Sequence, residues 1–443
     1  MKNFKYNKKT NSLFWESKLV EYWKKAAVVM GLGTWTDAMD FAVIMYAVAM
    51  LVSEWKLTPV ETTWLLTTFG VGGYISMLLN FVTGPLIDAI GRKKMWVIGN
   101  LIAGIAYLGA STAPNWFVLT FWRLLGVLTL AFTLPAFYTL MPEEVPADKR
   151  QTIIALAGIL NMVGVLNINL FLALTGVFPW LTWRIMAAYV GFADLLLAIL
   201  GLIILREPPL WQERRKLIKE GKIPKEESKV SYREILSGEM RKKWLVAVLV
   251  PLCFSMTGIA TVTNMYLSYF QAAILKWSPA IIGVIGLIGT IVGAITRMLM
   301  GPISDRVGRL NTIIIFAIPS AVACVLLWNT PNIVGIGEHL PVVAFYMIMS
   351  IIFGLGTSAQ EDTGRTYISE VVPARARGTS QSLLQALKTI VLTPLQTAAG
   401  LLAAVISPTV AYGTFPLIGF ILGVAGAIAA KKMGLETRGK ILD

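Results

Sequence analysis

Apolar stretches, each long enough to cross a lipid bilayer, recur along the whole chain. A helix needs roughly 20 mostly apolar residues to span a bilayer core of about 30 Å. Charged residues make up only 14% of the 443 residues, which is too few to coat a soluble protein of this size. The sequence therefore predicts an all-α integral membrane protein with twelve transmembrane helices. The predicted spans are 26–52, 62–83, 93–112, 116–140, 152–178, 184–205, 244–268, 280–300, 311–328, 341–363, 381–405 and 409–430.

The net charge of +14 is concentrated in two polar segments. Lysines crowd the N-terminal arm up to Lys25, and basic residues recur in 206–243, whereas the loops assigned to the other side carry little beyond Lys56 and Lys276. Cytoplasmic loops of membrane proteins carry an excess of Lys and Arg. The pattern predicts a multi-pass protein of the cell membrane with both termini in the cytoplasm. It does not form the basic stripe, interleaved with aromatic residues, that a nucleic-acid site requires.

The residues that usually hold metals or perform catalysis are scarce. Cys253 and Cys324 both lie in apolar stretches, and His339 is the single histidine. This gives neither a disulfide framework nor a metal-ligand spacing, and no Walker-type loop is present to bind ATP. We therefore expect no enzyme activity and no cofactor, and any proton handling must use carboxylates. The expected partners are the bilayer, protons and a small-molecule substrate, with the protein acting as a monomer.

Two motifs occur twice, in the same order. The pattern G-P-x-x-D-x-x-G-R is found at 84–92 and again at 301–309, and E-x-x-P-x-x-x-R is found at 143–150 and at 370–377. Each copy follows the second or the fourth predicted span of its half. Self-similarity of this kind indicates an internal duplication.

The duplication predicts two six-helix halves related by an axis along the membrane normal, which is a known layout of transporters. The predicted division is an N-terminal half at 1–205, a cytoplasmic linker at 206–243 and a C-terminal half at 244–443.

The repeated motifs resemble the signature loops of the major facilitator superfamily. Within it, they are similar to the branch of sugar porters, organic ion transporters, and aromatic-acid and phosphate proton symporters. The sequences R-E-P-P-L-W at 206–211 and L-E-T-R-G at 435–439 resemble the P-E-S-P-R-W-L and P-E-T-K-G of that branch. The resemblance covers nearly the whole chain, and it implies alternating access around a central cavity.

Charged residues of the repeated motifs are the predicted gate. A carboxylate at a helix end can pair with an arginine or cap a neighbouring helix. By resemblance, these residues form intracellular networks that latch the halves in the outward-open state and break when the protein opens inward; the alternative is that they only anchor the topology. The predicted gating residues are Asp88, Arg92, Glu143, Arg150, Asp305, Arg309, Glu370, Arg377, Glu207 and Glu436.

Ionisable residues inside predicted spans suggest a proton site. An ionisable side chain at bilayer depth is costly and indicates function by default. Asp37 and Asp40 lie three residues apart in the first span, hence on one helical face, and Arg123 lies in the fourth span. An ionised Asp40 would bind Arg123, whereas a protonated Asp40 would release it. Such a pair can switch with the proton, although a purely structural ion pair is the alternative.

Resemblance sharpens this prediction. D-F-A-V-I at 40–44 is similar to the Y-D-T-A-V-I of proton-coupled sugar porters, and Arg123 matches the arginine of their G-R-x-x-G-G. This implies that Asp40 carries the proton. T-D-A-M-D at 36–40 is also similar to motifs of phosphate and aromatic-acid symporters, so Asp37 is a second candidate beside the favoured Asp40, and the two carboxyl groups can titrate together.

The substrate is the least determined feature. The sugar-porter sequences Q-Q-L-S-G-I and G-P-x-P-W are replaced by F-S-M-T-G-I at 254–259 and G-T-S-A-Q at 356–360, which argues against hexose. Lys388 either attracts an anionic solute or neutralises Glu361 or Asp362. We predict a proton-coupled symporter of a small polar organic solute, with an organic acid favoured; a sugar transporter or a transport-fold sensor is the alternative. The predicted substrate-binding residues are Lys388, Asn264, Gln360, Gln385, Asn161 and Trp35.

Overall fold

The computed structural model describes residues 12–68, 70–144, 150–208, 238–255, 262–371 and 377–437, with residues 212, 216 and 220. All regular structure in these ranges is helical. The first helices are α1 (Ser12–Trp55), α2 (Pro59–Leu66), α3 (Gly72–Ile90), α4 (Arg92–Ser111), α5 (Trp116–Glu144), α6 (Arg150–Leu174) and α7 (Trp183–Ile204). The later ones are α10 (Gly238–Ser255), α11 (Val262–Tyr269), the π-helix η1 (Phe270–Ile274), α12 (Pro279–Val307), α13 (Arg309–Trp328), α14 (Thr330–Ile333), α15 (Leu340–Val371), α16 (Arg377–Val405) and α17 (Pro408–Lys432).

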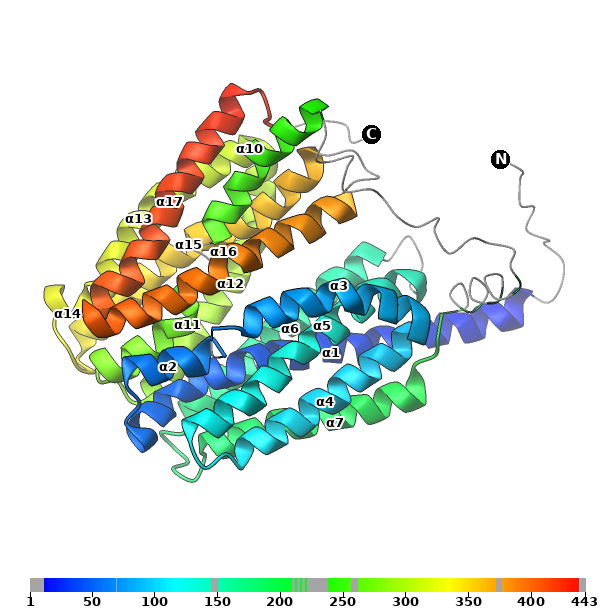
Figure 1. Cartoon of the computed structure of the whole chain (residues 1–443), viewed down its shortest axis with the longest axis horizontal. Helices are drawn as coiled ribbons and strands as arrows, with labels where there is room; N and C mark the ends of the chain where they lie inside the picture. The colour runs from blue at the N-terminus through cyan, green and yellow to red at the C-terminus, as the bar shows by residue number, and fades with distance from the viewer. Residues whose placement is uncertain are drawn as a thin grey trace.

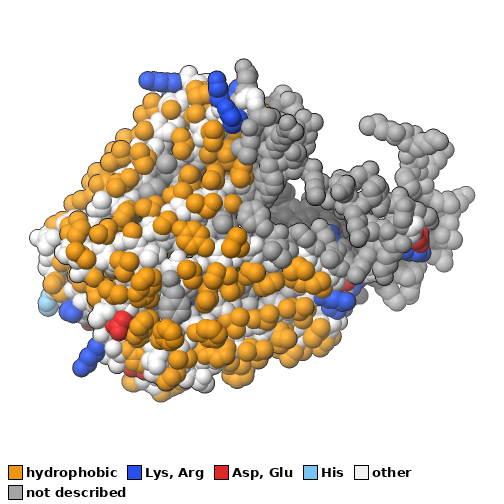
Figure 2. All heavy atoms as spheres, viewed as in Figure 1, with side chains coloured by type: hydrophobic (Ala, Val, Ile, Leu, Met, Phe, Trp, Pro, Cys, Tyr) orange, Lys and Arg blue, Asp and Glu red, His pale blue; other side chains and the backbone are white. Residues whose placement is uncertain are grey.

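Nine helices within the described residues are long and apolar enough to cross a membrane. The other three predicted spans correspond to α4, to α2 followed by α3, and to α10 followed by α11 and η1. Large apolar side chains cover the outer surface of the helices (Figure 2), with Phe192 and Ile203 of α7 as examples of strongly exposed ones. An apolar surface of this extent is unfavourable in water and suits lipid.

The helices form two sets. Within α1–α7, α4 packs against α5 and α7, and α1 packs against α6 and α7. Within α10–α17, α13 packs against α15 and α17, and α10 packs against α17. Figure 1 shows the two sets meeting at the end that carries α2, α11 and α14, here called the closed end, and spreading apart toward the end that carries both termini. The predicted linker at 206–243 lies mostly outside the described residues, so the exact division into halves stays a prediction.

The second predicted span is not one continuous helix. It breaks between α2 and α3, where Thr68 and Gly70 have positive φ values of 50° and 73°. Glycine tolerates this conformation because it has no Cβ atom. A Cβ atom at Gly73 would collide with the Thr393 side chain of α16, and one at Gly70 would lie 3.3 Å from Thr397. The glycines therefore let α16 approach the break closely, which the apolar pattern alone did not predict.

Helices α6 and α12 form the most extensive contact between the two sets. Gly283 and Gly286 of α12 lie against Ala173 and Asn169 of α6 so closely that a Cβ atom at either glycine would overlap them. The Asn169 amide also donates a hydrogen bond to the Thr290 hydroxyl, at 3.3 Å. Close packing of this kind resists added volume, so this seam holds the closed end shut.

The seam predicts a conformational effect of Gly283→Leu. The new side chain would overlap the Ala173 backbone, so α6 and α12 should separate at the closed end and the population should shift toward a form open there. Distances between spin labels at Val177 and Ile336, both exposed at the closed end, would measure the change. Gly158→Leu is the matched control, because nothing lies within 4 Å of a Cβ atom at Gly158. Equal distance distributions in both variants would contradict the role of the seam.

Candidate functional site

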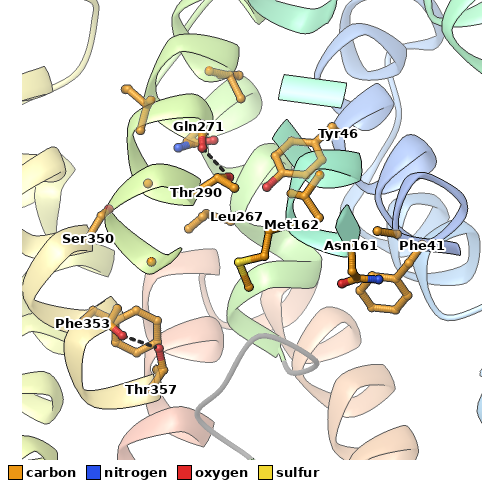
Figure 3. Close-up of a pocket in the computed structure, with 18 of the residues that line it drawn as sticks. Phe41, Tyr46, Asn161, Met162, Leu267, Gln271, Thr290, Ser350, Phe353 and Thr357 are labelled. Carbon is orange, nitrogen blue, oxygen red and sulfur yellow. Dashed lines mark hydrogen bonds between the residues drawn. The ribbon is translucent and has the colours of Figure 1, made fainter. Parts of the chain in front are cut away.

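A cavity of about 440 Å³ lies between the two sets of helices. Its walls come from α1, α5 and α6 on one side and from α11, η1, α12, α13 and α15 on the other. Figure 3 shows Phe41, Tyr46 and Asn161 across the cavity from Ser350 and Phe353. Most lining residues are apolar, and the lining includes no lysine or arginine among the residues that the structure describes. A mostly apolar cavity with a few polar groups is typical of small-molecule sites.

Asp37 is the acidic residue of this lining, and its side chain is almost fully buried. The Thr133 hydroxyl of α5 donates a hydrogen bond to Asp37 Oδ1 at 2.8 Å. The second oxygen, Oδ2, has no hydrogen-bond partner among the residues that the structure describes. A buried carboxylate without a cation is unfavourable, so this oxygen of Asp37 is a candidate position for a bound proton.

Two further acids lie behind the cavity wall. Asp40 of α1 and Asp194 of α7 are 2% and 1% exposed, and their carboxyl groups are placed to hydrogen bond with each other. Neither oxygen of Asp194 accepts a hydrogen bond of good geometry among the described residues, although the Thr36 hydroxyl also lies beside this carboxyl group. Two carboxylates can only accept, so the contact becomes a hydrogen bond once one of them carries a proton. The pair therefore has the geometry of a shared-proton site.

Sequence reasoning gave Asp194 no role. It lies in a predicted span, which is the signal that could have identified it, but the spacing of residues within one helix cannot show that α7 packs against α1. The Tyr107 hydroxyl of α4 fixes the same part of α1 by donating to the Asp40 carbonyl oxygen at 2.6 Å.

Arg123 does not form the predicted ion pair with Asp40 in this conformation. No nitrogen of its buried guanidinium lies within 4.0 Å of a carboxylate of the described residues. Arg123 Nη2 instead donates to the carbonyl oxygen of Leu66 at 3.3 Å, and within the described part of the chain Nε and Nη1 have no hydrogen-bond partner. Leu66 ends α2, where the carbonyl groups lack helical partners and attract a cation. Arg123 thus binds the break between α2 and α3.

The predicted substrate-binding residues are only partly brought to the cavity. Asn161 lines it and donates to the Thr34 carbonyl oxygen at 2.9 Å. Trp35 is not part of the lining; it packs edge-on against Tyr189, with ring centroids 6.5 Å apart. Lys388 is buried on α16 and is not part of the lining either. The side chains of Asn264, Gln360 and Gln385 lie outside the described residues.

Sequence reasoning missed the polar residues that the second set of helices brings to the cavity. Gln271 of η1, Thr290 of α12, and Tyr346, Ser350 and Thr357 of α15 all line it. They are scattered among apolar residues of three different segments, and only the three-dimensional packing gathers them.

Two predicted gating residues cap equivalent helices. The Glu207 carboxylate accepts the backbone N–H groups of Lys93 and Lys94, at 3.3 and 3.2 Å, at the start of α4. The Glu436 carboxylate accepts those of Arg309 and Leu310, at 2.9 and 3.1 Å, at the start of α13. Anions are stabilised at helix N-termini, so the duplicated sequences make the same contact in each set of helices.

The glycine of the repeated motif makes room for this carboxylate. Gly91 and Gly308 precede α4 and α13 with φ values of 125° and 104°, which favour glycine. A Cβ atom at Gly91 would overlap the Glu207 carboxylate, and one at Gly308 would lie 3.2 Å from that of Glu436.

The other gating predictions have mixed outcomes. Arg309 forms an ion pair with Asp305 at 2.6 Å, and Arg92 is buried. Glu144, which was not among the predicted gating residues, forms an ion pair with Arg206 at 3.1 Å. The side chains of Asp88, Glu143, Arg150, Glu370 and Arg377 lie outside the described residues, so the full latch stays a prediction.

The fold and the cavity define a polytopic helical membrane protein with a cavity between two helix sets. The family profile of the Major Facilitator Superfamily matches residues 30–393 and 261–438. The chain therefore belongs to the major facilitator superfamily and is a membrane transporter, not an enzyme, which confirms the predicted family and fold class.

Relatives of known activity transport different solutes. The chain is 24% identical over 378 residues to the cis,cis-muconate transport protein of Acinetobacter baylyi, covering 81% of this chain and 82% of that one. It is 23% identical over 397 residues to the arabinose-proton symporter of Bacillus subtilis, covering 79% and 80%. A niacin transporter of Acinetobacter baylyi is 36% identical over 129 residues, which are 29% of this chain and 28% of that one. The match to this niacin transporter therefore spans less than a third of its length.

Solved structures share the fold. The D-xylose-proton symporter gives a TM-score of 0.72 at 18% identity and covers 95% of this chain and 100% of its own. A bacterial homologue of the lysosomal transporter Spinster, in an inward-facing and occupied conformation, gives 0.71 at 16% identity and covers 95% and 99%.

Two acids contact Arg309 at the start of α13, and the helix cap predicts that their removal lowers the stability of the protein by different amounts. Glu436→Gln removes a charge that accepts two backbone N–H groups and should cost about 1 kcal/mol. Asp305→Asn removes an exposed pair four residues apart and should cost about 0.5 kcal/mol or less. Melting temperatures of the purified variants would show the order, and a larger loss in Asp305→Asn would contradict it.

Proposed function

We propose that the protein is a proton-coupled symporter of a small organic acid. The observation that carries this proposal is the free Oδ2 atom of buried Asp37 in a cavity whose described lining has no lysine or arginine. An ionised Asp37 would repel an anionic solute in this apolar site. A protonated Asp37 is neutral and can donate a hydrogen bond to the solute carboxylate. Anion and proton then bind together, which is the thermodynamic basis of symport.

Asp40 and Asp194 supply the second part of the coupling. Two adjacent buried carboxyl groups do not both stay ionised without a cation. In this conformation Arg123 is held by Leu66 and is not within ion-pair distance of Asp40. In the opposite conformation, movement at the break between α2 and α3 would free Arg123 to approach Asp40 and expel the proton. Arg123, Asp40 and Asp194 thus have two states: in one the acids hold a proton and Arg123 binds Leu66, and in the other Arg123 binds Asp40. Both protonation and the conformation of the protein shift the balance between these states.

The walls of the cavity favour an unsaturated or aromatic acid. Phe41, Phe353 and several aliphatic side chains surround only a few polar groups, whereas a sugar presents hydroxyl groups on all sides and needs many partners. Muconate and niacin, which relatives transport, are acids of the favoured kind. A sugar is the second candidate, supported by the arabinose-proton symporter among the relatives.

The distribution of charge supports an orientation. The helix ends on the side of the termini carry Lys93, Lys94, Arg241 and Lys432 among other cations, as the positive-inside rule expects of the cytoplasmic side. With the termini in the cytoplasm of a cell-membrane monomer, the closed end faces outward and this conformation is inward-facing.

Proton coupling is tested by Asp37→Asn, Asp40→Asn and Asp194→Asn in proteoliposomes. Uptake of nicotinate or muconate driven by a pH gradient should fall to the level of empty liposomes in Asp37→Asn and in at least one variant of the acid pair. Solute counterflow, which needs no net proton movement, should persist. Glu61→Gln removes an exposed carboxylate at the start of α2 and is the control.

Concentrative uptake that survives in all three aspartate variants would contradict proton coupling at this site. Uptake of arabinose or xylose, with no uptake of the acids, would replace the organic acid by a sugar.

A further inference from the structure

Four cations lie at one end of the second helix set, where α10 begins and α17 ends. Arg241 and Lys242 belong to the start of α10, and Lys431 and Lys432 are the last residues of α17. All four side chains are exposed, and α10 packs against α17 (Figure 1). Figure 2 shows Lys and Arg side chains at this end of the second set, above a largely apolar surface. These four residues are called the basic patch below.

The charge of the basic patch is not balanced within the described part of the chain. None of its four cations has a described carboxylate within 4.0 Å. Lys431 Nζ donates to the Asn311 amide oxygen at 2.8 Å, a neutral acceptor that leaves the charge in place. The described acids at this end of the set are already engaged, because Asp305 pairs with Arg309 and Glu436 caps α13. The basic patch therefore carries a net positive charge.

Helix dipoles account for only two of the four cations. A cation is stabilised at a helix C-terminus, where Lys431 and Lys432 lie, and is disfavoured at an N-terminus. Arg241 and Lys242 lie beside the N-terminal, positive end of α10. The positive-inside rule requires cations near the ends of spans, but it does not require those of two helices to converge. A bound anion would offset the repulsion among these groups.

The last helix of the first set, α7, ends differently. Arg206 follows it, and the Arg206 guanidinium lies 3.8 Å from the centroid of the Tyr22 ring and pairs with Glu144 at 3.1 Å. The charge at this helix end is thus balanced inside the protein. The end of α17 has no such partner among the described residues, so its cations remain available to a ligand.

Exposed apolar side chains run from the basic patch toward the middle of the membrane. Leu245 and Leu249 are exposed on α10, as are Ile421 and Ile428 on α17. Spacings of four and seven residues place them on the same helix faces as the cations that follow at the ends. A Cβ atom at Gly426 of α17 would lie 3.6 Å from Leu249 Cβ, so the two apolar stripes are neighbours.

We propose that the basic patch binds the phosphate group of an anionic phospholipid, whose acyl chains lie along the exposed stripes of α10 and α17. Such a lipid meets both requirements of the surface, since its headgroup is an anion and its chains are apolar. Basic clusters at the ends of transmembrane helices are known to bind anionic headgroups. The bound lipid would join the first and the last helix of the second set. This inference goes beyond the proposed function and does not depend on the transported solute.

The test titrates the purified full-length protein in detergent with two phospholipids of identical chains, dioleoylphosphatidylglycerol and dioleoylphosphatidylcholine. A lipid that binds the folded state raises the melting temperature, and wild type should gain more from phosphatidylglycerol. Each Lys or Arg near an anionic headgroup strengthens binding about fivefold. Arg241→Gln combined with Lys432→Gln should therefore need roughly 25-fold more phosphatidylglycerol for the same gain.

Two variants serve as controls. Lys24→Gln combined with Lys25→Gln removes two exposed cations from α1 at the same end of the molecule, outside the basic patch. Arg241→Lys combined with Lys432→Arg keeps both charges of the patch. Both variants should respond to phosphatidylglycerol as wild type does.

Three results would overturn the proposal. The first is an equal gain from both phospholipids in wild type. The second is an equal loss in the two glutamine variants, because the effect would then reflect net charge alone. The third is a gain from glycerol 3-phosphate at the same concentrations, since this probe carries the phosphate without acyl chains and would assign the patch to a free phosphate.

Discussion

The cost of burying carboxyl groups in a membrane-spanning bundle governs this structure. Asp37, Asp40 and Asp194 are all nearly inaccessible, and none has a cation within ion-pair distance among the described residues. Apolar side chains at these three positions would often make the folded protein more stable. Folding alone therefore does not explain why the positions are acidic. Their presence in one helix set, beside a solute-sized cavity, makes sense if protons come and go there.

The two sets of helices contribute different kinds of side chain to the cavity and its surroundings. The first set carries the acids and Arg123, while the second contributes Gln271, Tyr346 and Ser350. The cavity therefore has acidic residues on one side and neutral polar residues on the other. The helix caps of Glu207 and Glu436 do not line the cavity, and each cap joins residues of one helix set.

The sequence was informative wherever the chemistry is local. Most spans follow from the apolar runs, and the structure has them. Motif resemblance predicted Glu207 and Glu436 as gating residues; the structure places each of them at a helix N-terminus, and their gating role stays a prediction. The break at Thr68 and Gly70, the contact of Asp40 with Asp194, and the polar residues that α12, α15 and η1 bring to the cavity depend on which helices become neighbours. Spacing within one helix does not encode that. For the same reason Arg123 was assigned to Asp40, although it reaches Leu66 in this conformation.

Proton uptake on solute binding tests the coupling most directly. Calorimetric titration of the purified protein with nicotinate or muconate near neutral pH, repeated in buffers of different ionisation enthalpy, counts the protons that accompany binding. If solute and proton share the site, each solute bound takes up a proton from the buffer, and Asp37→Asn abolishes this uptake. Solute binding with the same heat in every buffer, and the same affinity across pH, would contradict proton-coupled recognition.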